Sequence, residues 1–131
     1  MSGPTLSESD VLVTRAHLAS RLRAWQDGEL SAEELMEWAA ALFEEELLEF
    51  DDVEDEYNSA AKEVLSFVER IDMNLALPED VPIHLKFLEA PLGEYEDAYE
   101  EWLDDLDEID LDERRQRLRG VPPYARHLRD D

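Results

Sequence analysis

Carboxylates are the commonest side chains of this chain that could take part in catalysis or metal binding, since Asp and Glu supply 36 of its 131 residues. Paired carboxylates can perform acid–base catalysis when a pocket separates their pKa values. Here paired acids recur along the chain, so no pair stands out. They fall on the solvent-facing positions of helical patterns, and we interpret them as surface charge rather than as catalytic groups.

A calcium-binding loop is the next chemistry that clustered acids could support. An EF-hand loop requires acids at positions 1, 3 and 5 and glycine at position 6. A loop that starts at Asp52 has Tyr57 at position 6, and residues 104–113 contain no glycine. The sequence therefore predicts no dedicated metal site.

Histidine, cysteine and glycine do not indicate any other reactive site. His17, His84 and His127 form none of the i, i+3 or i, i+4 pairs that zinc sites use, and no Glu-x-x-His unit of a di-iron site is present. We interpret His17 and His84 as ordinary residues at a helix surface or boundary. The chain has no cysteine, no Gly-x-Ser-x-Gly and no glycine-rich phosphate loop. We expect a protein that is not an enzyme and that uses no cofactor.

The elements that carry the acids are predicted to be helices. Apolar residues recur at the 3.6-residue period, and no segment shows the alternation of a strand. Ser31 and Glu34 form a capping box shortly after Gly28, which predicts a short connection between the first two helices. The expected helices cover residues 11–27, 59–73, 77–89, 94–108 and 110–120, with one more that begins after Ser31.

These patterns predict an all-α fold, a single compact bundle of about four to six short helices. The length fits a single helical domain over residues 1–131. Residues 1–10 are expected to be a flexible lead, and residues 121–131 a loose tail that contains arginine. The three tryptophans lie on apolar stripes and are expected to pack in the core.

The net charge of −24 indicates what this protein touches. An acidic surface repels nucleic-acid phosphates and anionic membranes, and it attracts basic surfaces. We therefore predict a basic protein partner, a toxin, nuclease or DNA-binding protein, with no direct nucleic-acid binding and no membrane contact. The sequence shows no signal peptide and no membrane-spanning run of about 20 apolar residues, so we expect a cytoplasmic protein.

The densest acidic stretch is residues 44–56, which holds nine acids and no base. Phe50 and Tyr57 lie inside or beside it. They either pack under the loop or serve as anchors for a partner, since aromatic residues are favoured at interface hot spots. The predicted partner-binding residues are Glu44, Glu45, Glu46, Glu49, Phe50, Asp51, Asp52, Glu54, Asp55, Glu56 and Tyr57.

A second acidic face is predicted on the helix of residues 94–108. Its apolar residues form an unbroken i, i+3, i+4 stripe, and its other face is almost wholly acidic. The members of this secondary face are Glu94, Asp97, Glu101, Asp104, Asp105 and Glu108.

An arginine-rich end follows this helix. Residues 114–131 hold six Arg and two Asp, whereas residues 1–113 hold 34 acids and six bases. The arginines either fold back on the acidic face of residues 94–108 and relieve its self-repulsion, or contact an acidic partner. We favour the first arrangement.

The first half of the chain has a recognisable order of features. They are a helix, the segment Asp27-Gly28-Glu29-Leu30-Ser31-Ala32-Glu33-Glu34-Leu35, an acidic stretch and a third helix. Over about residues 11–75 this order is similar to the small helical bacteriocin immunity proteins of the colicin D type. The resemblance implies an immunity or antitoxin-type inhibitor that covers a basic nuclease surface, with the acids of residues 44–56 facing the toxin.

Two other functions fit the same acidity. A DNA mimic would array carboxylates at phosphate-like spacing, along the face of residues 94–108, and occupy a DNA-binding protein. A housekeeping or adaptor domain would use its acidity for solubility alone. The composition leaves all three functions open, and inhibition of a basic partner is the one that we favour.

Overall fold

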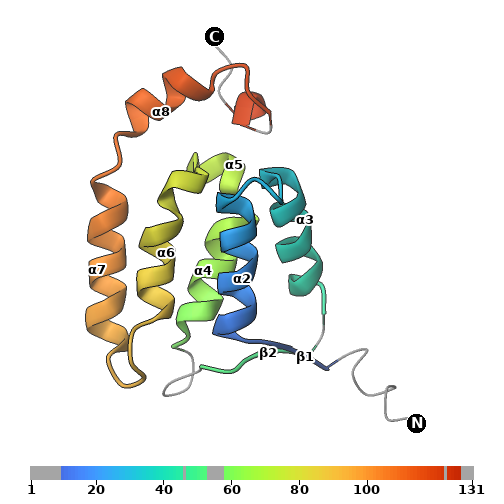
Figure 1. The fold of residues 1–131 in the computed structure, drawn as a ribbon, viewed down its shortest axis with the longest axis vertical. Coiled ribbons are helices and arrows are strands. Elements are labelled where there is room, and N and C mark those ends of the chain that lie inside the picture. The colour runs from blue at the N-terminus through green and yellow to red at the C-terminus, as the bar shows by residue number, and fades with distance from the viewer. Residues whose placement is uncertain (1–9, 46, 53–57, 123, 128–131) are drawn as a thin grey trace.

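A computed structural model describes residues 10–45, 47–52, 58–122 and 124–127 of the chain (Figure 1). Seven α-helices dominate the described residues and are joined by two short strands and two 3-10 helices. The elements are β1 (Asp10–Val13), α2 (Arg15–Gln26), α3 (Ala32–Phe43), β2 (Leu47–Phe50), α4 (Ala60–Glu69), α5 (Ile71–Asn74), η1 (Pro78–Asp80), α6 (Val81–Leu88), α7 (Tyr95–Asp107), α8 (Leu111–Leu118) and η2 (Tyr124–His127). The predicted compact all-α fold is confirmed.

The helices form a bundle in which α7 is the outermost member on one side (Figure 1). α6 lies between α7 and the pair formed by α2 and α4, and α3 packs against α4 on the opposite side. α8 crosses near one end of α7 (Figure 1). None of the described helices combines the length and the apolar character that a membrane span requires.

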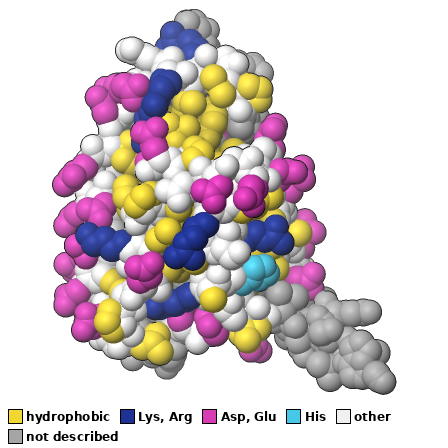
Figure 2. Space-filling view, in the orientation of Figure 1, with side chains coloured by type: hydrophobic (Ala, Val, Ile, Leu, Met, Phe, Trp, Pro, Cys, Tyr) yellow, Lys and Arg dark blue, Asp and Glu magenta, His cyan; other side chains and the backbone are white. Residues whose placement is uncertain are grey.

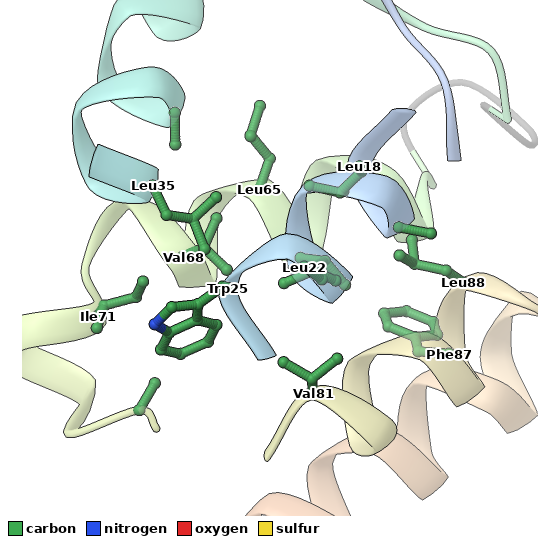
Figure 3. Packing of buried hydrophobic residues seen from close by; sticks show 14 of the residues in the cluster. Leu18, Leu22, Trp25, Leu35, Leu65, Val68, Ile71, Val81, Phe87 and Leu88 are labelled. Carbon is green, nitrogen blue, oxygen red and sulfur yellow. The ribbon is translucent and has the colours of Figure 1, made fainter. Parts of the chain in front are cut away.

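The core is built from the apolar stripes of these helices (Figure 3). Branched aliphatic side chains pack together in this cluster, and the rings of Trp25 and Phe87 pack against them. Burial of such side chains is the main favourable contribution to the free energy of folding. The fully or nearly fully buried members labelled in Figure 3 are Leu18, Leu22, Trp25, Leu35, Leu65, Val68, Ile71, Val81, Phe87 and Leu88.

A small parallel sheet corrects the prediction that the chain contains no strand. β1 pairs with β2, with Val13 opposite Phe50, and α2 and α3 form the crossover between the two strands. Val13 is buried and Leu12 is exposed, as expected for alternate residues of a strand. The first helix was predicted to begin at residue 11, but Thr14 caps α2 by accepting a hydrogen bond from the backbone N–H of His17. The helix therefore begins at Arg15.

The helix predicted over residues 59–73 is divided into α4 and α5. Arg70 ends α4 and precedes α5 with a non-helical backbone conformation. Leu75 then ends α5 in the left-handed conformation, with φ of 55°, which is uncommon for a residue with a side chain. Because the Leu75 side chain is buried in the core, its packing offsets the backbone strain.

The prediction of a loose tail from residue 121 is wrong at Tyr124. Its side chain is only 4% exposed, and its hydroxyl donates a hydrogen bond to the Ala76 carbonyl after α5. Burial is the main reason that the pKa of Tyr124 is raised to about 12. The chain after α8 therefore returns to the core. The predicted flexible lead of residues 1–10 is wrong at Asp10, which begins β1, and residues 1–9 and 128–131 lie outside the described residues.

Candidate functional site

The first predicted surface, residues 44–57, is divided by the structure. Glu44, Glu49 and Asp51 are exposed, Glu45 is partly buried, and Phe50 packs against the core from β2. Part of the predicted surface lies outside the described residues, namely Glu46, Glu54, Asp55, Glu56 and Tyr57. Phe50 is thus partly buried against the core, as the packed alternative predicts.

Asp52 is a structural residue, which corrects its assignment to a partner-binding surface. Its side chain is 3% exposed and accepts hydrogen bonds from Arg15 Nε at 2.6 Å, from the Ser59 hydroxyl and from the Ala61 backbone N–H at 3.1 Å. Burial alone would raise the pKa of Asp52, but these three donors lower it below its ordinary value. The carboxylate is therefore ionised, and both of its oxygens accept hydrogen bonds from groups within the chain.

Arg15 extends this contact into a joint between distant segments. Its Nη1 donates to the carbonyl oxygens of Leu88 and Ala90 at 2.8 and 2.6 Å, at the end of α6. Its backbone N–H donates to Asp51. The start of α2, the end of β2, the start of α4 and the end of α6 thus meet around one guanidinium group.

The second predicted surface is the outer face of α7. Tyr95, Ala98, Tyr99, Trp102 and Leu106 turn toward the bundle and pack against the core. The remaining positions carry seven acids and no base over the 13 residues of the helix. Figure 2 shows these acids as a nearly continuous band along the edge of the molecule where Figure 1 places α7.

The acids of α7 occur as four adjacent pairs. The pairs begin at Glu96, Glu100, Asp104 and Asp107, and the last one includes Glu108 just after the helix. Residues four apart in a helix lie on the same face about 6 Å apart along the axis. The helix therefore presents two neighbouring rows of carboxylates, and Glu94, Asp97, Glu101, Asp104 and Glu108 of the predicted face are all exposed, with Asp105 partly buried.

Compensation of this charge is confined to the edge that faces α6. Lys86 lies 2.7 Å from Glu101 and 3.6 Å from Asp105, and its hydrogen bond to Glu101 raises the pKa of its ammonium group. Glu96, Glu100, Asp104 and Asp107 form no ion pair with any described residue. Their charge is therefore directed to solvent and is available to a partner.

The arginine-rich segment does fold back, but its target is η1 rather than α7. Arg114 is 5% exposed, and its two terminal nitrogens each lie 2.7 Å from one oxygen of Asp80. It also donates to the Leu75 carbonyl, and Arg117 lies 3.4 Å from Glu79. The prediction that these arginines fold back on the acidic face of residues 94–108 is therefore wrong for Arg114 and Arg117, which pair with acids of η1.

A buried aromatic contact fixes the position of α7. Trp102 Nε1 donates to His84 Nδ1 of α6 at 3.0 Å, and the Trp102 ring stacks on Phe87 with centroids 4.9 Å apart. His84 is fully buried, so the interpretation of this residue as a surface or boundary residue is wrong. The signal was the spacing of Val81, His84 and Leu88, since positions i, i+3 and i+7 share a helix face.

Burial determines the protonation of His84. Because Nδ1 accepts the Trp102 hydrogen, the neutral ring carries its proton on Nε2, which is buried without a hydrogen-bond partner in the described structure. Desolvation lowers the pKa of His84 to about 4, although the nearby Asp80 carboxylate acts in the opposite direction. The ring is therefore neutral near pH 7 and serves as the acceptor that orients Trp102.

An apolar groove adjoins the acidic face. It has a volume of about 470 Å³ and lies between the end of α4, α5, the second half of α7 and the start of α8. Three large hydrophobic side chains that remain exposed line it, namely Met73, Leu103 and Leu111. Sequence reasoning did not identify this groove because its walls come from segments about 30 residues apart.

Comparisons with known proteins add no assignment to this geometry. The chain matches no protein-family model, no curated protein and no solved structure. Within the described residues, no group of three or more His, Asp or Glu side chains is arranged to hold a metal ion. The acidic face of α7 and the adjoining groove are the features from which a function can be argued.

Proposed function

We propose that this protein is an acidic protein-binding module, an immunity or antitoxin-type inhibitor that covers a basic, nuclease-like surface of a partner. The observation that carries the proposal is the outer face of α7, where Glu96, Glu100, Asp104 and Asp107 pair with no base of the described residues. A nuclease cleft is basic because it binds phosphates, so such a face complements it and steers fast association. The protein acts by occupying the cleft and performs no reaction of its own.

The site of this proposal is α7 rather than residues 44–57. Asp52 is paired with Arg15 and Phe50 packs against the core, whereas the outer face of α7 carries exposed acids along the whole helix. The contact of Trp102 with His84 and Phe87 holds the acidic face in one position. A surface that is ordered before binding loses less conformational entropy when the partner docks.

Capture followed by an activity assay tests the proposal. The full chain is immobilised, incubated with lysate from its own source at 50 mM NaCl, and eluted with increasing salt. We expect a basic nuclease to be retained and to elute with salt, and its cleavage of nucleic acid to stop at a 1:1 ratio with the added protein. Retention of no basic protein even at low salt would refute the proposal, as would a retained nuclease that stays active in the complex.

A DNA mimic is a second candidate, favoured by the paired acids of α7. Carboxylates that repeat about every 6 Å along two rows resemble the regular phosphates of a nucleic-acid strand. The same capture distinguishes the two functions. A DNA-binding protein without nuclease activity, displaced from its DNA by the added chain, would support mimicry.

A further inference from the structure

The apolar groove beside α7 has the character of a docking surface for one or two large side chains. Met73 is 59% exposed, Leu103 40% and Leu111 43%, and all three line the same hollow. Phe67, Leu106 and Ile109 complete its apolar lining. Exposed apolar side chains gathered in one hollow mark an interaction site more often than isolated ones do.

The charge around this groove specifies what fits it. Leu103 lies at i+3 and i+7 from Glu100 and Glu96, and Asp107 follows it at i+4, so these acids share its side of α7. Asp107 itself lines the groove. Arg115 is a base in the lining of this groove, and it pairs at 2.8 Å with Asp112 of its own helix. The groove is therefore apolar at its floor and acidic along the α7 rim.

We infer that the groove between α5, α7 and α8 receives a basic amphipathic helix of the partner protein. An apolar stripe of that helix would occupy the hollow between Met73, Leu103 and Leu111, and its Lys or Arg side chains would pair with Glu96, Glu100 and Asp107. This inference rests on the proposed function, because it names the segment that the α7 face binds. Helix-in-groove recognition combines apolar anchors with flanking charges in this manner.

Charge argues against a second copy of this chain as the occupant. Each copy carries a net charge of −24, and a symmetric contact would place the acidic rim of one groove against that of the other. Like charges brought together at an interface oppose association. A basic partner segment carries the opposite charge, so the acidic rim attracts it. It is therefore the occupant that the charge of the rim favours.

Binding of designed peptides tests this inference with the full chain. The probe is a fluorescein-labelled 18-residue helical peptide with a leucine stripe and lysines at the other positions, and the control peptide has serine in place of each leucine. Fluorescence anisotropy at 150 mM NaCl gives the Kd of each. We expect the leucine peptide to bind at least about tenfold more tightly than the serine peptide, because only the former fills the groove.

Matched variants locate the binding. Leu103→Gln with Leu111→Gln replaces two of the three exposed apolar side chains of the groove and is expected to weaken binding of the leucine peptide by about tenfold. Leu12→Gln with Leu92→Gln changes two exposed leucines outside the groove and is expected to leave the Kd within about twofold of the wild type. Circular dichroism confirms that each variant is folded.

The outcomes separate this inference from the proposed function. Equal binding of the two peptides, or an unchanged Kd for Leu103→Gln with Leu111→Gln, would overturn the groove assignment. A natural partner that still binds this variant but not an acid-neutralised α7 would leave the proposed function standing. Dimers in sedimentation that disappear in the groove variant would assign the groove to a second copy and overturn the inference.

Discussion

Asp51 and Asp52 are adjacent acids that differ in burial. Asp51 is exposed, whereas Asp52 is buried against Arg15, Ser59 and Ala61. The sequence presents both as members of one acidic stretch. The difference depends on Arg15, which lies 37 positions away from Asp52 and reaches it only after α2 and β2 have come together. Local patterns carry no such information, so this part of the predicted surface could not be separated in advance.

Replacement of Asp52 by alanine is expected to destabilise the fold by about 3 kcal/mol, because the partly buried Arg15 loses its counter-ion and two donors lose their acceptor. Urea denaturation at pH 7 measures this free energy of unfolding. Glu49→Ala, at an exposed acid of the same stretch, is the control and should cost less than about 0.5 kcal/mol. Equal losses for the two variants would contradict the structural role of Asp52.

His84 makes the stability of the fold depend on pH. Its pKa is about 4 in the folded chain and near 6.5 in the unfolded chain, so the unfolded chain takes up the proton first on acidification. The contribution is fully present above pH 6.5 and is lost as the pH falls toward 4, by at most about 3 kcal/mol. His84→Gln keeps an acceptor for Trp102 and does not titrate, so we expect this variant to lose less stability between pH 7.5 and 4.5 than the wild type.

The control for this measurement is His17→Gln, since His17 is exposed. It should retain the pH dependence of the wild type. The difference in the free energy of unfolding between the two pH values, from urea denaturation, is the quantity to compare. A His84→Gln variant with the same pH dependence as the wild type would show that another group is responsible.

At the scale of the elements, α7 was predictable and β1 was not. Helical periodicity alone predicts the buried side of α7 at Tyr95, Ala98, Tyr99, Trp102 and Leu106. Leu103 belongs to the same predicted apolar stripe, but it is 40% exposed. The capping box of Ser31 and Glu34 likewise sets the start of α3, with both hydrogen bonds present. A strand of four residues carries too few alternations to be distinguished from the start of a helix. The partner of β1 is also separated from it in the sequence by α2 and α3.

Arg114 attaches α8 to η1 through its pair with Asp80. Arg114→Met would leave the buried Asp80 carboxylate without its counter-ion, and we expect a loss of about 3 kcal/mol in the free energy of unfolding. Arg115→Met, at an exposed arginine one position later, should cost less than about 0.5 kcal/mol. The double variant Arg114→Met with Asp80→Asn should lose less than the sum of its single variants. Additive losses would contradict a direct pair.

At the scale of the whole molecule, two arginines pair with buried acids, whereas most of the described acids and bases lie at the surface. Arg15 and Arg114 are bound within the bundle, and Lys86 is held at the edge of α7. The sequence predicted both the charge and the folding back of the arginines. It did not predict that their target is η1, because that choice depends on how α8 turns after α7. The consequence is that α7 retains its uncompensated charge.

Salt is expected to stabilise the isolated protein. Self-repulsion at a net charge of −24 opposes the folded state, and ions screen it. The free energy of unfolding should therefore rise between 0.05 and 0.5 M NaCl. A variant with Glu96→Gln, Glu100→Gln and Asp104→Asn should gain less than the wild type over this range. A fall in stability with salt would mean that surface ion pairs outweigh the repulsion.

The most direct test of the account compares two triple variants for binding to the captured partner. The first neutralises α7 through Glu96→Gln, Glu100→Gln and Asp104→Asn. The second neutralises Glu29, Glu33 and Glu37, three exposed acids in the connection before α3 and on α3 itself. We predict that calorimetric titration at 150 mM NaCl shows a Kd at least about tenfold weaker for the first variant and within about threefold of the wild type for the second. Equal weakening of both, or no weakening of the first, would contradict the assignment of the binding surface to α7.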